Sequence, residues 1–243
     1  MRRIVLPAVL ATLALAGCGG GGESAPETVA TATQPPARTY PQQPAAGKLL
    51  TRFVDAAARG DTDALFSMLT VRAQQIYGPT AEAFAKTVGK ELTEGVGAFR
   101  REGAFEVALS MQATRDWAVA VIAGHVTREG TTAYGAYGLP ARKEGGAWKL
   151  ELGGSVSFNP ISPDEQLTTD STPQIATELD ANEPILESAI WVDRTSIEPI
   201  VSPDSLLMNG EVTVPIPPGR HTAVTFAATE SSAGVNAFSF TSR

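Results

Sequence analysis

The sequence contains very little cysteine and histidine. Of its 243 residues, one is cysteine and two are histidine. A single cysteine cannot close a disulfide bond within the chain. His125 and His221, without further cysteines, do not supply the usual ligands of a zinc or copper site. We therefore expect no metal and no other cofactor, and the folded parts have to rely on apolar cores.

Basic residues are also scarce and dispersed. Lys and Arg total 19 against 26 Asp and Glu, which gives a formal net charge of -7. No basic run is longer than a pair such as Arg100–Arg101. An acidic chain without a basic cluster is not attracted to nucleic acid or to anionic lipid. We expect no nucleic-acid partner and no attachment to a membrane by surface charge.

The apolar run near the N-terminus is too short to span a membrane. It covers the 13 residues from Ile4 to Ala16, whereas a spanning helix needs about 20. The run follows the basic start Met1-Arg2-Arg3 and precedes small residues, which is the layout of a secretory signal peptide.

The residues at the end of this run, Leu15-Ala16-Gly17-Cys18, resemble the bacterial lipobox. The resemblance implies that residues 1–18 are a lipoprotein signal and that Cys18 carries lipid as the first mature residue. Two or three acyl chains hold a protein durably on a bilayer. The chain would then lie on the extracytoplasmic face of the cell membrane. The alternative is an ordinary signal peptide with a chance cysteine.

Residues 19–46 contain mainly Gly, Pro, Ala, Thr and Gln. Such a composition does not bury enough apolar surface to offset chain entropy. We expect a disordered tether in which Tyr40 is an isolated aromatic residue.

Residues 47–158 show helical spacing first and strand alternation afterwards. Leu49, Leu50 and Phe53 begin an amphipathic helix that Gly60 ends. Asp61 and Thr80 are suited to cap later helices. Strands are expected near residues 105–111, 117–126, 131–139 and 148–152, with Glu151 pointing outward. Because the second strand is apolar on both faces, it is either central in its sheet or lies between a helix layer and another buried surface.

Two stretches of this region resemble NTF2-like (SnoaL-type) domains. They are the Ala-Arg-Gly-Asp helix end with Ala64-Leu65-Phe66-Ser67-Met68-Leu69, and the hairpin Lys143-Glu144-Gly145-Gly146-Ala147-Trp148-Lys149-Leu150. The resemblance implies an α+β cone, in which helices pack on a curved antiparallel sheet around an apolar pocket. Family enzymes hold an acid or an Asp/His pair in that pocket. The possible pocket residues here are Tyr77, Trp117, His125 and Tyr134.

Residues 159–243 lose helical spacing after a break at residues 159–163. Short strands are expected at residues 174–179, 188–193, 211–214, 221–228 and 236–241, the signature of a β-sandwich. Ile190-Trp191-Val192-Asp193, residues 218–224 and Phe238-Ser239-Phe240 are similar to bacterial Ig-like domains. That resemblance places Trp191 in the sandwich core, without the usual disulfide.

These features favour a noncatalytic, lipid-anchored protein of the cell envelope that presents an NTF2-like and an Ig-like module. The modules would bind a protein, a glycan or a small apolar ligand. Catalysis needs a positioned group with a partner, and His125 has no evident one, so we expect no enzyme. The alternatives are a small-molecule isomerase or hydrolase that uses His125, and an accessory of cell-wall assembly.

Overall fold

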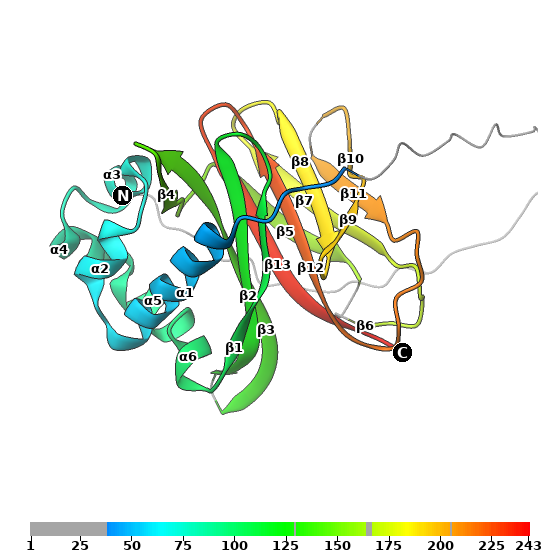
Figure 1. Ribbon diagram of the computed structural model, residues 1–243, viewed down its shortest axis with the longest axis horizontal. Helices are drawn as coiled ribbons and strands as arrows, with labels where there is room; N and C mark the ends of the chain where they lie inside the picture. Colours follow the sequence, from blue (N-terminus) through cyan, green and yellow to red (C-terminus); the bar gives the residue numbers. More distant parts are fainter. Residues whose placement is uncertain (1–37, 129, 164–166, 205) are drawn as a thin grey trace, which may run out of the picture. The chain divides into compact units, whose positions relative to one another are not determined.

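The computed structural model describes residues 38–128, 130–163, 167–204 and 206–243, which belong to one compact unit (Figure 1). The predicted signal peptide, Cys18 and most of the predicted tether lie outside the described residues. Within the described ranges, no helix combines the length and apolar character needed to cross a membrane.

The helices follow one another from residue 44 to residue 101. Gly60 ends the first in the left-handed conformation (φ 67°), and backbone N–H groups donate to the side chains of Asp61, Thr70 and Thr80 at the starts of α2, α3 and α4. These caps confirm the predicted helix boundaries. The helices are α1 (Pro44–Arg59), α2 (Thr62–Ser67), α3 (Val71–Tyr77), α4 (Ala81–Phe84), the π-helical η1 (Ala85–Gly89), α5 (Lys90–Gly95) and α6 (Ala98–Arg101).

Four strands then form the first sheet, in the order β1-β2-β3-β4 and antiparallel throughout. They are β1 (Phe105–Gln112), β2 (Trp117–Arg128), β3 (Thr131–Glu144) and β4 (Ala147–Leu150). Gly145 and Gly146 connect β3 to β4 with φ of 56° and 84°, a conformation that favours glycine. The predicted hairpin is confirmed.

The remaining strands form two sheets that pack face to face as a β-sandwich. The middle sheet has the order β6-β13-β12-β8-β9, and the outer sheet has the order β10-β11-β7-β5. All neighbouring strands are antiparallel except β6 and β13. The strands are β5 (Val156–Ser162), β6 (Leu167–Thr168), β7 (Gln174–Ala181), β8 (Glu187–Val192), β9 (Thr195–Ile197), β10 (Ile200–Val201), β11 (Leu207–Glu211), β12 (Gly219–Ala228) and β13 (Ala233–Ser242).

The first sheet lies between the helices and the middle sheet (Figure 1). Along β2, Ala118, Ala120 and Ile122 join the core beneath the helices. Val119 and Val121 join a second core that is shared with β8 and β12. The alternation therefore buries both faces of β2, as its sequence predicts.

Trp191 does not lie in the core of the sandwich. Its neighbours Ile190 and Val192 face the outer sheet, whereas Trp191 faces the first sheet and is 1% exposed. The expectation from Ig-like domains is wrong here because the middle sheet is covered on both faces. A residue on its far face can therefore be fully buried.

The last residues of the predicted tether are part of the fold. Gln112 N donates to Pro41 O at 2.8 Å, and Gln43 N donates to Ser110 O at 2.8 Å. The Tyr40 ring meets Trp191 edge-on, with 5.0 Å between ring centroids. Residues 38–43, which we call the strap, therefore lie along the edge of β1, and the prediction of disorder is wrong for them.

Two strand predictions in the second half are also corrected. The expected break at residues 159–163 is largely strand β5, which contains Pro160. This proline is tolerated because β5 is an edge strand with a register shift between Pro160 and Ser162. The domain boundary predicted between residues 158 and 159 falls inside β5. The strand expected at 211–214 is β11, which ends at Glu211.

Candidate functional site

A pocket of ≈ 640 Å³ opens between helices α5 and α6 and strands β2 and β3. It lies on the helix-facing side of the first sheet. Its lining is mostly apolar and comes from four regions of the chain. The lining residues are Glu91, Leu92, Gly95, Val96, Phe99, Val126, Thr131, Ala133, Gly135, Ala136, Tyr137 and Leu152.

The pocket exists because small residues occupy its sheet wall. Ala133 and Gly135 alternate along β3 and leave the space that a larger side chain would fill. A Cβ atom added to Gly135 would lie 3.7 Å from Phe99 Cζ and 3.9 Å from Val126 Cγ2, which are ordinary contact distances. The glycine is therefore not required by close packing, and it keeps the cavity open.

The helix wall follows a π-helical turn. The sequence pattern predicts one helix through Phe84, Val88 and Leu92, but η1 (Ala85–Gly89) interrupts it. A π turn adds a residue and changes which side chains face the sheet after it. Glu91 and Leu92 follow this turn, and both line the pocket.

Two ionisable side chains line the pocket among the residues whose side chains are described. Tyr137 is partly buried, and its hydroxyl makes no hydrogen bond with another described residue. Burial raises the pKa of Tyr137 far above its ordinary value, with smaller contributions from Tyr77 and Glu91. Its hydroxyl therefore keeps its proton and can donate a hydrogen bond to a ligand. Glu91 is exposed at the mouth and can accept one.

Of the four predicted pocket residues, only Tyr77 lies on the helix side of the first sheet. It packs edge-on against Phe84 at 6.3 Å between ring centroids. Burial is the main cause that raises the pKa of Tyr77, and Glu91 adds to it. Tyr77 therefore lies close to the pocket, although it is not among the residues that line it.

Trp117, His125 and Tyr134 lie on the opposite face, which corrects the prediction that the four share a pocket. Trp117 belongs to the core between the first and middle sheets. His125 is exposed and meets Tyr134 edge-on at 5.3 Å, and the guanidinium of Arg220 lies 4.1 Å above the Tyr134 ring centroid. The cause is the two-residue repeat of a strand, which sends His125 to the same side as Trp117.

Two polar pairs have structural roles away from the pocket. Glu151 is 1% exposed, accepts a hydrogen bond from Thr70 Oγ1 at 2.5 Å and pairs with Arg72, so the prediction that Glu151 points outward is wrong. His221 Nδ1 lies 2.9 Å from Asp193 Oδ2, and its Nε2 lies 2.8 Å from Pro217 O. Because both ring nitrogens are engaged, this pair secures the turn after β8.

The pocket residues Glu91, Phe99 and Tyr137 were not predicted as site residues. The sequence does carry a signal for this pocket, because every second residue of the strand at 133–135 is small, and a strand face with small residues leaves space beneath a covering helix. In the part of the chain that the structure describes, no three His, Cys, Asp or Glu side chains gather as potential metal ligands.

No family model and no curated protein matches the sequence. Among solved structures, the chain is similar to an NTF2-like protein of unknown function from Shewanella oneidensis MR-1. The identity is 20% and the TM-score 0.29, and the match covers 42% of this chain and 88% of that protein.

Proposed function

We propose that this chain is a lipid-anchored binding protein of the bacterial cell envelope. Its NTF2-like part, formed by the helices and the first sheet, holds a small apolar molecule in the pocket between α5–α6 and β2–β3. Its β-sandwich is an Ig-like module that supports this part. The anchor is the lipid on Cys18.

The pocket is the single observation that carries this proposal. Its volume of ≈ 640 Å³ lies within the range of small-molecule sites, and apolar side chains with a few polar groups are the usual lining of such sites. The Tyr137 hydroxyl supplies a hydrogen-bond donor at the sheet wall. An apolar ligand with one hydrogen-bond acceptor therefore suits the site.

Binding without turnover is favoured over an isomerase or hydrolase activity. General acid–base catalysis needs a group whose pKa lies near the working pH. The pKa of Tyr137 is raised away from that range. His125, the proposed base of an enzyme, faces the other side of the sheet.

The proposal is tested by titrating the full chain carrying Cys18→Ser with a neutral fluorescent probe such as N-phenyl-1-naphthylamine. Gly135→Leu should fill the pocket and weaken probe binding about tenfold or more. The matched control is Thr132→Leu, because Thr132 is an exposed residue of β3 that does not line the pocket. Equal binding by both variants would show that the probe binds elsewhere.

The anchor is tested separately in cells that process bacterial lipoproteins. The protein should incorporate labelled palmitate and enter the detergent phase, and Cys18→Ser should abolish both. Unchanged partition of the Cys18→Ser variant would contradict a lipid anchor.

A further inference from the structure

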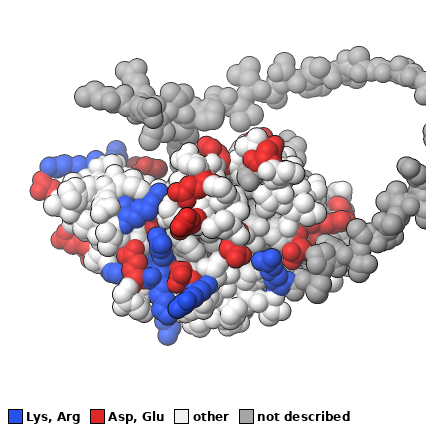
Figure 2. All heavy atoms as spheres, turned by 90° about the horizontal axis from the view of Figure 1, so that it is seen from above, with Lys and Arg blue, Asp and Glu red and all other residues white. Residues whose placement is uncertain are grey.

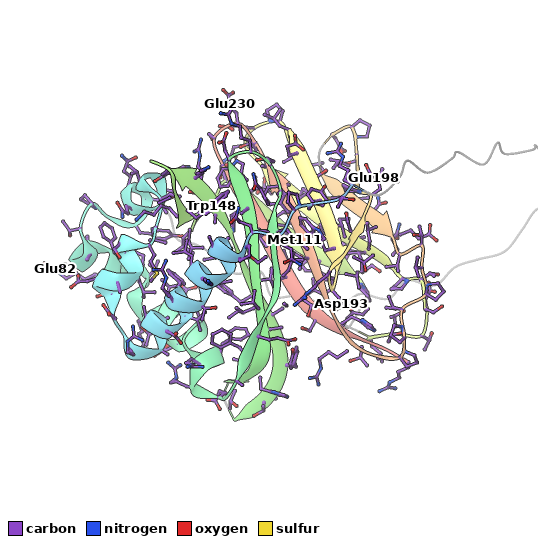
Figure 3. The ribbon with its side chains drawn as sticks, in the orientation of Figure 1. Glu82, Met111, Trp148, Asp193, Glu198 and Glu230 are labelled. Atoms are coloured by element: carbon purple, nitrogen blue, oxygen red, sulfur yellow. The ribbon has the colours of Figure 1, made fainter. Side chains whose placement is uncertain are left out.

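A second groove runs along α1, on a different part of the molecule from the pocket. Its walled part is a hollow of ≈ 280 Å³ between α1, β1 and Arg194, and this hollow opens onto the face of α1 that carries Lys48, Thr51 and Arg52. Val107 and Met111 of β1 contribute apolar lining to the hollow. The groove can be located in Figure 3 from two labelled residues, Met111 on β1 and Asp193 just after β8. Asp193 directly precedes Arg194 in the sequence. We call this feature the α1 groove.

Every charged residue that lines the α1 groove is basic. Lys48 and Arg52 come from α1, and Arg194 comes from the turn between β8 and β9. All three are exposed, and none forms an ion pair with a described carboxylate. Over the face seen in Figure 2, basic and acidic side chains are interspersed. The groove is thus a local positive site on a chain of net charge -7.

Arg194 is held over the groove by a contact with the first sheet. Its Nε donates to Ala108 O, 3.5 Å away. The turn that carries Arg194 is itself secured, because Asp193 Oδ1 accepts from Thr222 N at 3.0 Å and Asp193 Oδ2 pairs with His221. The third cation therefore has a defined position relative to Lys48, although 146 residues separate the two in sequence.

The groove adjoins the point where the tether enters the fold. Gln42 of the strap and Pro44 at the start of α1 both line it. About 20 residues separate Cys18 from Arg38, and a chain of that length can span at most about 70 Å. If Cys18 is lipidated, as the proposed function requires, the groove lies within reach of the lipid head groups.

We propose that the α1 groove binds the head group of an anionic phospholipid. This proposal revises the expectation that surface charge does not attract the chain to anionic lipid, because the fold brings together basic residues that are dispersed in the sequence. Lys48, Arg52 and Arg194 contact the phosphate, to which arginine donates two parallel hydrogen bonds. The apolar lining of Val107 and Met111 packs against the glycerol and the first methylene groups. The lipid on Cys18 would hold the chain at the membrane, and the groove would orient it there.

The test measures sedimentation of the full chain carrying Cys18→Ser with phosphatidylcholine vesicles, with and without phosphatidylglycerol. Because every variant keeps the same N-terminal segment, differences between variants report on the folded part. We expect binding only with phosphatidylglycerol. Lys48→Gln, Arg52→Gln and Arg194→Gln should each weaken it about fivefold, and the triple variant about 100-fold.

The matched control is the triple variant Lys86→Gln, Lys90→Gln, Lys143→Gln, which changes the net charge equally at exposed sites that lie outside α1 and do not line the groove. It should bind like the parent chain. An equal loss in both triple variants would overturn the proposal in favour of general charge attraction. Groove-dependent binding of free glycerol phosphate or polyglycerol phosphate without vesicle binding would overturn the lipid as the source. Thermal midpoints check that each variant is folded.

Discussion

The two faces of β2 are both apolar, but they are packed in different ways. On the face toward the middle sheet, Val119 and Val121 pack with Trp191 and Phe226 in one core, and each of these four side chains is at most 1% exposed. On the face toward the helices, Ala118, Ala120 and Ile122 are equally buried. Beyond Ile122, however, that second face ends in the open pocket that Val126 lines.

The difference follows from side-chain size on the neighbouring strands. Large side chains from β8 and β12 fill the space beside the first face, and they hold the two halves of the molecule together. On the helix face, Ala133 and Gly135 of β3 leave room that α5 and α6 do not fill. The first sheet thus borders an open pocket on its helix side, and on its other side it packs against the middle sheet.

The largest effect on stability is expected from Trp191, which lies in the core between the first and middle sheets. Trp191→Ala should lower the free energy of unfolding by about 3–5 kcal/mol, because it removes a fully buried aromatic side chain between two sheets. The measurement is urea denaturation followed by circular dichroism. Trp148→Ala, at a partly buried position against the helix-side core, should cost less.

The same denaturation experiment tests whether the halves are separate. Because the described residues share the core around Trp191, the parent chain should unfold in one transition with all probes. Two transitions, or an equal cost for Trp148→Ala, would show that the contact between the first and middle sheets is weak.

A smaller effect on stability is expected from the strap, because its Tyr40 packs against Trp191 at the edge of the core between the first and middle sheets. Tyr40→Ala removes the edge-on contact with Trp191 and should cost about 1–2 kcal/mol. Tyr40→Phe keeps the ring and serves as the control, with a change below about 0.5 kcal/mol. The strap should also exchange its amide hydrogens faster in Tyr40→Ala. No change in exchange would mean that the backbone pairing with β1 holds it alone.

Local signals in the sequence predicted the helices, their caps and most of the strands. Gly60, Asp61 and Thr80 act within a few residues, so their roles can be predicted from the sequence alone. The burial of both faces of β2 from Trp117 to Ala123 can also be predicted from the sequence, since this stretch has no charged or strongly polar side chain to face water.

What was missed depends on residues that are distant in sequence. His125 was assigned to a pocket because its strand was apolar, but nothing local says which face of β2 meets the helices. The strand alternation predicts that Glu151 points outward. The prediction fails because its partners Thr70 and Arg72 lie some 80 residues earlier in the sequence, where local patterns give no sign of them. The prediction that Trp191 lies inside the sandwich is wrong because the first sheet, which covers the other face of the middle sheet, comes from a distant part of the sequence.

The smallest effect is a difference in how stability depends on pH, and it compares Tyr137 and Tyr134 on opposite faces of β3. Burial raises the pKa of Tyr137 on the pocket side. Below about pH 10, the ordinary tyrosine pKa, this residue is neutral in both states and the full stability is present. Above it, the unfolded chain loses the proton while the folded chain retains it. Stability should therefore fall by up to about 1.4 kcal/mol per pH unit.

Tyr137→Phe keeps the ring and removes this proton, so its stability should fall less steeply between about pH 10 and about pH 11 than that of the parent chain. The control is Tyr134→Phe on the opposite face. Burial and, to a smaller degree, Glu106 also raise the pKa of Tyr134, and Arg220 opposes them. The shift is smaller than that of Tyr137, so this variant should follow the parent chain more closely. Urea midpoints at each pH provide the comparison. Identical slopes for the two variants would mean that the pocket wall around Tyr137 is as open to water as the surface around Tyr134.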